Sequence, residues 1–320
     1  DEIVGVQPMQ GPVGQIHTLR VRYAETVTST ATGDFGTDTV AGDEALSPFK
    51  IATAYSGSTT TGRADVTAAK EGVGGSKISI QILKQPVEAK TRKLQARWTF
   101  EAAQDAQSMH GLDVEAEIMA ALAQEITAEV DQEVLASLRS LAATEETFDQ
   151  AAVSGTATFV GDEHAALAIL VNRVANLIAQ RTRRGAGNWA VVSPQALTVL
   201  QSASTSAFAR TTEGTFEAPT NTKFVGTLNG AMKVYVDSYA ADDKAVLVGY
   251  KGASETDAAA FYCPYIPLMS SGTVLDPSTF EPVVSFMTRY GYVELSNTAS
   301  SLGNAGDYVG EVAMSNISFK

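Results

Sequence analysis

The sequence predicts an α+β protein with two lobes, and three observations support this prediction. Residues 93–100 alternate between polar and apolar side chains, which is the two-residue period of a half-buried strand. Residues 113–141 carry apolar side chains at every third or fourth position and contain no Gly or Pro, as expected of one long amphipathic helix. The 320 residues suffice for about two domains, and the strand and helix patterns lack the regular rhythm of a parallel α/β sheet.

The composition limits the classes of function. Lys and Arg number 23 against 36 Asp and Glu, so the net charge of −13 has the wrong sign for binding nucleic acid through its phosphates. A single cysteine, Cys263, cannot form a disulfide within the chain, which fits folding in the cytoplasm. No apolar run approaches the roughly 20 residues that cross a bilayer, and the first residues lack a signal-peptide pattern. We therefore expect neither a membrane anchor nor specific nucleic-acid binding.

The N-terminal part combines two strands with a long polar segment. Residues 4–23 start with Pro and Gly and end in alternation, which predicts a loop leading into a strand. Residues 24–76 are rich in Thr, Ser, Gly and Ala and cannot pack a core of their own, so they are interpreted as a flexible loop or a long hairpin. A second strand starts at Lys77, where isoleucines alternate with other residues, and is expected to end before Pro86.

The strand and the long helix form the predicted structural centre of the chain. The alternation places the apolar side chains of the strand on one face, and the helical stripe faces them. Asp113 is the expected N-cap of the helix. The predicted core anchors are Trp98, Phe100, Ile118, Leu122, Ile126 and Val130.

The opposite side of the long helix is acidic. Glu125, Glu129 and Glu133 belong to a row of carboxylates with no Lys or Arg four residues away, so helix-internal ion pairs do not explain them. A basic surface on a neighbouring subunit is one interpretation, and a solvated helix face is the other. Both stay open at the level of sequence.

A second amphipathic helix is expected from Asp162 as N-cap to Gly185. Arg181, Arg183 and Arg184 close it, as the helix dipole favours. These arginines are also candidates for contacts between subunits.

A buried strand over residues 189–192 leads into a helix that Ser193 caps and Pro194 begins. The remaining predictions are a polar loop over 202–222, strands over 232–236 and 245–250, and a strand over 283–293 that returns to the sheet of the long helix.

The sequence contains no recognisable catalytic or metal-binding constellation. His17, His110 and His164 lie in three separate predicted elements, without the spacing of metal ligands. Cys263 lies between aromatic residues and is interpreted as a packed apolar side chain. The carboxylates of the long helix lie along one face with no sign of a cleft. We therefore expect no cofactor, no metal and no enzymatic activity.

Four segments carry a resemblance to a known family. They are, in order, VQPMQGPVGQI, VEAKTRKLQARWTFEAAQDAQSMHGLDVEAE, VGYKGASETDAAAFYCPYIPL and FEPVVSFMTRYG. Together they resemble the signature segments of the major capsid proteins of T-even-type contractile-tailed phages. Because the four matches are spread over most of the chain, the resemblance is specific.

The resemblance implies the Hong Kong 97-type capsid fold, which encapsulin shells share. Its parts are a peripheral domain with a long spine helix, an axial domain, an extended loop and an N-terminal arm. The expected divisions are the end of the arm and the first peripheral strand at 1–23, the extended loop at 24–85, the peripheral domain at 86–160 with the spine helix at about 113–141, the axial domain at 161–260, and the return to the peripheral domain at 261–320. The segment 24–85 has no room for the folded insertion that T-even-type members carry there.

The resemblance also implies assembly: hexamers and pentamers of this chain would form an icosahedral head around double-stranded DNA without binding it specifically. The extended loop would lie across a neighbouring subunit. Removal of a propeptide by a phage protease fits the missing initiator Met. Portal, vertex, scaffold, protease and decoration proteins are the implied partners, and the virion, assembled in the host cytoplasm, is the implied location. The alternatives are an encapsulin-like shell and an acidic surface or adhesion protein.

Overall fold

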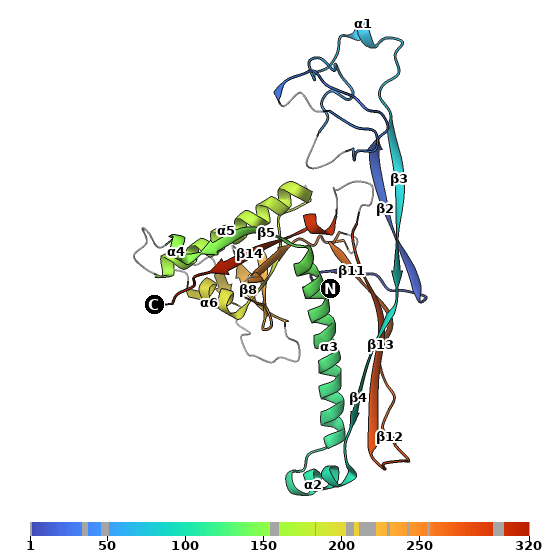
Figure 1. Ribbon diagram of the computed structural model, residues 1–320, viewed down its shortest axis with the longest axis vertical. Coiled ribbons are helices and arrows are strands. Elements are labelled where there is room, and N and C mark those ends of the chain that lie inside the picture. The colour runs from blue at the N-terminus through green and yellow to red at the C-terminus, as the bar shows by residue number, and fades with distance from the viewer. Residues whose placement is uncertain are drawn as a thin grey trace.

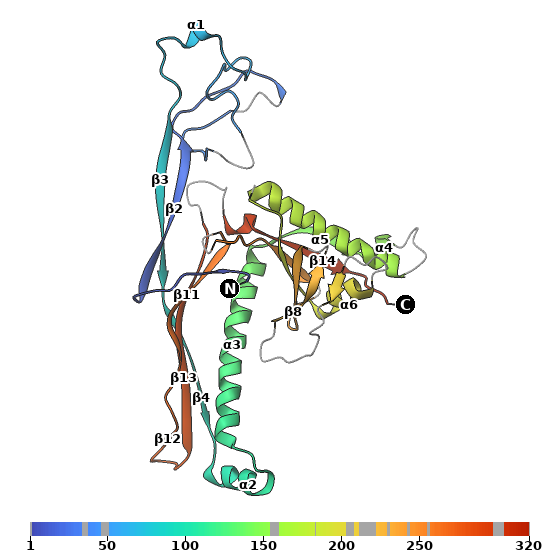
Figure 2. The same cartoon turned by 180° about the vertical axis from the view of Figure 1, so that it is seen from behind.

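The computed structural model describes residues 2–33, 38–45, 51–153, 160–182, 184–202, 208–210, 222–228, 231–241, 244–254, 257–296 and 304–319. These residues form a long arm and a lobe beside it (Figure 1). The arm runs from a two-stranded ribbon to a short helix at its far end, and Figure 2 shows the same arrangement from behind. The mixture of helices and strands confirms the predicted α+β class.

The lower part of the arm is a sheet on which the long helix lies. Strand β13 (Pro282–Glu294) pairs with both β4 (Lys90–Arg97) and β11 (Ala260–Ser270) in antiparallel register. The predicted return of residues 283–293 to the sheet of the long helix is thereby confirmed. The remaining strands of this sheet are β1 (Gly5–Val6), parallel to β11, and β12 (Val274–Leu275), antiparallel to β13.

The long helix α3 spans Val114–Leu141, close to the predicted range, and its 28 residues extend about 42 Å. The Asp113 side chain accepts a hydrogen bond from the Glu115 amide, which confirms it as the N-cap. The apolar stripe of α3 covers β13 and β4, with Val284 and Phe286 buried beneath it. The predicted anchors that pack in this cluster are Trp98, Ile118, Leu122, Ile126 and Val130.

Phe100 is the anchor that was predicted wrongly. Strand β4 ends at Arg97, and Thr99 caps the helix α2 (Phe100–His110) by accepting from the Ala102 amide. Phe100 is therefore the first residue of a helix rather than a continuation of the strand. Its side chain is 41% exposed and stacks on Phe280, with 5.7 Å between ring centroids.

The two strands predicted on either side of the polar segment pair with each other as a hairpin. Strands β2 (Val13–Tyr23) and β3 (Ile78–Glu88) pair along their whole length to form the ribbon, and the segment between them carries the short helix α1 (Thr67–Lys70). The prediction that β3 ends before Pro86 was wrong. A two-stranded ribbon leaves alternate amides without a ladder partner, so a proline can occupy such a position.

The described strands of the lobe are β5 (Ala143–Asp149), β6 (Trp189–Val192), β7 (Phe208–Arg210), β8 (Thr222–Leu228), β9 (Met232–Asp237), β10 (Val246–Gly249) and β14 (Val309–Ser315). They form one sheet in the order β5-β14-β10-β6-β9-β8-β7. The described helices of the lobe are α4 (Gln150–Val153), α5 (Val160–Thr182) and α6 (Pro194–Ser202), with a 3-10 turn at Ala305–Asp307. Helices α5 and α6 cover one face of the sheet, and His164, Leu167, Val199 and Val234 are buried beneath or between them.

The end of α3 joins the arm to the lobe. Leu135 and Leu138 pack against Trp189 and Leu247 on the face of the sheet of the lobe that α5 and α6 leave open. Arg139 of α3 forms an ion pair with Asp237 at the end of β9, with 2.5 Å between Nη2 and Oδ2. One helix therefore contributes to the cores of both parts.

The two sheets divide the chain at different points from the predicted boundaries. Strands β5 and β14 both belong to the sheet of the lobe, although residues 86–160 and 261–320 were assigned to the peripheral domain. Sequence periodicity gives no information on which sheet a strand joins. Helix α5 begins at Val160, so Asp162 lies in its first turn rather than at the N-cap. Much of the predicted loop 202–222 lies outside the described residues.

Candidate assembly surfaces

One face of the ribbon is open and apolar. In the β2–β3 register Leu19 lies opposite Ile82, and Ile78 and Ile80 follow on the same face, because alternate residues of a strand point the same way. Ile80 is 69% exposed and Leu19 64%. We call Leu19, Ile78, Ile80 and Ile82 the ribbon apolar face. Adjacent exposed aliphatic side chains of this kind are typical of a surface that another protein covers.

The polar segment of the same chain lies along part of one edge of the ribbon. The amides of Tyr23 and Ala45 donate to Asp43 and to Val21, which adds residues 43–45 to the outer edge of β2. The Arg20 guanidinium and the Glu44 carboxylate form an ion pair of 2.8 Å at the same place. These contacts hold the polar segment against the ribbon without covering the ribbon apolar face.

Two of the predicted acidic contact residues bind within the chain. Arg92 of β4 reaches α3, with 3.1 Å from Nη1 to Glu129 Oε2 and 2.8 Å from Nη2 to Glu133 Oε2. The Tyr290 hydroxyl accepts from Arg92 Nε at 2.7 Å and donates to Glu133. Their basic partner is therefore the neighbouring strand, and the carboxylates fasten the helix to its sheet.

The same network changes the ionisation of its members. Burial opposes ionisation of Glu133, but hydrogen bonds from Tyr290 and Arg92 outweigh it and hold the pKa of this carboxyl below its ordinary value. Burial and the bond to Glu133 raise the pKa of Tyr290 to about 12. At neutral pH the network thus holds an ionised carboxylate, a cation and a neutral phenol, which is the most favourable combination.

Of the remaining candidates, Glu125 is exposed, and no ion pair joins it to another described residue. Arg181 pairs with Glu145 of β5, and Arg184 pairs with Asp257 at 2.7 Å. Arg183 lies outside the described residues. The structure does not bring the three predicted glutamates together with Arg181 and Arg184. Glu125 is the acidic candidate that is left for a contact with another molecule.

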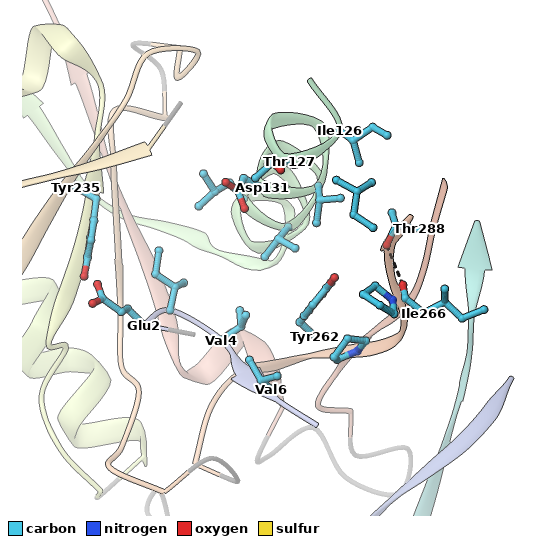
Figure 3. A pocket seen from close by; sticks show the side chains of 17 residues that line it. Glu2, Val4, Val6, Ile126, Thr127, Asp131, Tyr235, Tyr262, Ile266 and Thr288 are labelled. Carbon is cyan, nitrogen blue, oxygen red and sulfur yellow. Dashed lines mark hydrogen bonds between the residues drawn. The ribbon is translucent and has the colours of Figure 1, made fainter. Parts of the chain in front are cut away.

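A cleft of about 620 Å³ lies between α3, β11 and the first residues of the chain. Ile126, Val130 and Val4 give it apolar walls. Figure 3 shows Asp131 projecting from α3 into this space, with Tyr262 opposite it on β11. The expectation that no cleft accompanies the carboxylates of the long helix was therefore wrong, because β1 and β11 build a second wall that local sequence does not reveal.

The cleft is apolar with one partly buried carboxyl. Burial raises the pKa of Asp131, and burial together with the nearby Asp131 raises that of Tyr262. The described lining residues include no histidine, cysteine, lysine or arginine. The groups that could take part in proton transfer or nucleophilic attack are the carboxylates and the hydroxyls of Thr127, Thr288, Tyr235 and Tyr262.

Cys263 is buried beside Val87, Phe261 and Val293, and burial raises the pKa of its thiol, so it packs as predicted. Across the described residues no group of three or more His, Cys, Asp or Glu side chains is placed to hold a metal ion. Nor does any helix in the described ranges have the length and apolar character to span a membrane.

Comparison with known proteins identifies the family. The family model described as major capsid protein Gp23 matches residues 1–316. The chain belongs to the Gp23 major capsid protein family. The predicted resemblance to capsid proteins of T-even-type phages is thus confirmed. Membership also decides against the adhesion-protein alternative.

Individual relatives support membership in the Gp23 family. The major capsid protein of Vibrio phage KVP40 is 30% identical over 389 residues, which cover 95% of this chain and 75% of that protein. The major capsid protein of Enterobacteria phage T4 is 35% identical over 249 residues, 69% of this chain. The chain spans about half of the T4 protein, 47% of its length. The KVP40 alignment is longer than this chain, so that relative contains additional residues within the aligned region.

Solved structures confirm the Hong Kong 97-type capsid fold for this Gp23-family chain. A structure from Mycobacterium phage Cain has a TM-score of 0.55 at 12% identity and covers 98% of this chain and 89% of its own. The capsid structure of Cyanophage P-SCSP1u has a TM-score of 0.54 at 12% identity, covering 98% and 87%. Sequence identities this low show only that the fold is shared.

The ribbon apolar face and Arg92 are the features that sequence reasoning missed. The alternating isoleucines of residues 78–82 were recognised, but the pattern indicates only that one face is apolar and not that it stays uncovered. Arg92 is separated from Glu129 by 37 residues, so no local spacing rule links them.

Proposed function

We propose that this chain is the shell subunit of a tailed-phage head, and that its ribbon lies across a second copy of the chain. The observation that carries the proposal is the ribbon apolar face, four large aliphatic side chains that their own chain leaves exposed in a family of capsid proteins. Hexamers and pentamers arise when such heterologous contacts close into rings. The expected extended loop, 24–85, contributes Ile78, Ile80 and Ile82 to this face, and Leu19 comes from the strand that precedes the loop.

The wider proposal follows from family membership. The shell encloses double-stranded DNA without specific contacts, which the net charge of −13 supports because an acidic wall does not hold phosphates. Portal, vertex, scaffold, protease and decoration proteins are the partners, a phage protease removes an N-terminal propeptide, and assembly takes place in the host cytoplasm. Membership of a capsid-protein family supports a structural role over an enzymatic one. A genome-free shell differs in lacking DNA and a portal vertex.

The assembly itself is tested by electron microscopy and sizing of the purified native particle. Closed shells with DNA and a portal vertex are expected. A monodisperse monomer at high concentration, with scaffold and protease supplied, would contradict the proposal.

Ile80→Asp together with Ile82→Asp should abolish shell formation. Two carboxylates on the ribbon apolar face would have to be buried against the neighbouring subunit, and unpaired buried charges are strongly unfavourable. Because both side chains are exposed in the subunit, the thermal midpoint of the isolated chain should change little. Particle yield and subunit stability are measured in parallel.

Ile169→Asp is the matched control, because Ile169 is exposed to the same 69% as Ile80 but lies on α5 in the lobe. It should assemble normally. Wild-type yields of shells from the ribbon variant would refute the role assigned to the ribbon.

Glu125→Lys should lower the yield of particles without changing subunit stability. This carboxylate is exposed and without an intrachain ion pair among the described residues, so reversal of its charge acts mainly on contacts with other molecules. Glu129→Lys should in addition lower the free energy of unfolding of the subunit, by about 0.2–1 kcal/mol, since it removes an ion-pair partner of Arg92. Glu101→Lys on exposed α2 serves as the control for added charge. Equal yields of particles from Glu125→Lys and from wild type would contradict this prediction. Glu125 would then be a solvated residue, and Glu129 and Glu133 would make contacts only within the chain.

A further inference from the structure

The side chain of Gln150 hydrogen-bonds the backbone at the end of the described chain, as a neighbouring strand would. After β14, residues 316–319 pass the start of α4 (Figure 1). Gln150, the first residue of α4, forms two hydrogen bonds with one residue of this tail. The Ser318 amide donates to Gln150 Oε1 at 2.8 Å, and Gln150 Nε2 donates to the Ser318 carbonyl at 3.0 Å. The carboxamide thus pairs with both backbone groups of Ser318, as a neighbouring strand would.

Buried neighbours keep Gln150 in this orientation. Gln150 is 3% exposed, and its Nε2 also donates to Glu163 Oε2 at 2.7 Å, which fixes the nitrogen on that side of the carboxamide. His164 is fully buried, and its Nε2 faces the Ser318 carbonyl at 3.1 Å and Gln150 Oε1 at 3.3 Å. Both of these oxygens only accept, so Nε2 carries a hydrogen and donates. The Ser318 carbonyl thereby receives two donors.

Side chains on either side of Ser318 add selectivity. Ile317 packs against the core of the lobe, and the Phe319 ring meets His164 edge-on, with 5.6 Å between centroids and 70° between planes. Asn316 Nδ2 donates to Asp149 Oδ1 at 3.0 Å, and its φ of 53° turns the chain out of the sheet. The site thus contacts, in succession, the aliphatic side chain of Ile317, the backbone amide and carbonyl of Ser318, and the aromatic ring of Phe319.

We propose that Gln150 and His164 form a clasp for an extended peptide, which the chain's own residues 316–319 fill and from which they can be released. The clasp accepts the same segment when it is supplied as a separate molecule. This inference does not depend on the proposed function, because the contacts lie within one subunit and on the side of the lobe away from the ribbon (Figure 1).

The exposure of the tail supports its release. Ser318 is exposed and Phe319 is 51% exposed, so the segment buries only part of its surface against the fold. An empty clasp would leave the buried Gln150 carboxamide and the His164 Nε2 hydrogen short of partners, which favours rebinding of a peptide backbone.

The test uses the chain shortened after Ser315 and a synthetic peptide of residues 315–320, SNISFK. Calorimetry should show one binding site per shortened chain, with affinity at least about tenfold higher than for the full chain, whose clasp is filled. Gln150→Ala in the shortened chain should weaken binding by about tenfold or more, since two hydrogen bonds to the peptide are lost. Gln104→Ala on exposed α2 is the control and should leave binding unchanged.

Hydrogen exchange on the full chain gives an independent result should the shortened chain fail to fold. Gln150→Ala should accelerate exchange of the Ser318 amide by about tenfold or more, while the amide of Val312 in β14 stays protected. A folded shortened chain that ignores the peptide, peptide binding that survives Gln150→Ala, or unchanged Ser318 exchange would each overturn the proposal.

Discussion

Replacement of Asp237 by alanine should lower the free energy of unfolding by about 3–5 kcal/mol. Asp237 is fully buried and accepts from Arg139 Nη2 at 2.5 Å and from Gln132 Nε2 at 3.0 Å, both on α3. It also accepts from the Tyr239 amide at 3.1 Å. Without the carboxylate, the Arg139 guanidinium would remain in a mostly buried position with no counter-charge, and that uncompensated charge is the main cost. Denaturant unfolding of the isolated subunit measures the effect.

A double-mutant cycle separates the ion pair from the loss of the side chain. Arg139→Ala in the Asp237→Ala background should cost much less than Arg139→Ala alone, because no buried charge is then left unpaired. Asp105→Ala on exposed α2 should stay within about 0.5 kcal/mol of wild type. Strict additivity of the two substitutions would show that Arg139 and Asp237 do not stabilise one another.

Leu138→Ala should cost about 2–5 kcal/mol. Leu138 has no exposed surface and packs with Leu135, Trp189 and Leu247 where α3 meets the sheet of the lobe. Removing its isopropyl group opens a cavity that a helix fixed at both ends cannot close by shifting. Thermal and denaturant unfolding, followed by circular dichroism, should give the same destabilisation.

Met109→Ala provides the comparison for Leu138→Ala, since Met109 is 78% exposed at the end of α2 and should change stability by less than about 0.5 kcal/mol. If the two substitutions had equal effects, the end of α3 would not be buried against the lobe. If Leu138→Ala lowers the stability of the subunit while Trp98 still packs normally against β13, the lost stability comes from the contact between the arm and the lobe.

The elements with strong local patterns were predicted closely. Helix α3 begins after Asp113 and ends at Leu141. It could be predicted because its capping residue and its apolar periodicity both lie in one continuous stretch of sequence. Ser193 accepts from the Ala196 amide as the predicted cap of α6, and β6 occupies the predicted residues 189–192. Phe100 shows the limit of such reasoning. Phe100 continues the alternation of apolar residues in the sequence, but the strand ends at Arg97 and Thr99 caps a helix that begins at Phe100.

Pairings between distant elements could not be predicted. Strand β14 lies between β5 and β10 in the lobe, although 160 residues or more separate it from β5, and nothing in its own period selects that place. The clasp on the tail joins Gln150 and Ser318, 168 residues apart. The cleft beside Asp131 exists because β1 and β11 stand opposite α3.

By itself, the sequence determined the α+β class, the long helix with one acidic side, the polar segment between two strands, and the membership of a capsid family. These properties depend on periodicity, capping and motif order, which short stretches of chain contain. The tertiary structure alone decided that Glu129 and Glu133 bind Arg92 while Glu125 stays open, and that one face of the ribbon is left uncovered. A residue's own neighbours in sequence define which side of an element is apolar or charged. What covers that side depends on chain segments folded against it from far away.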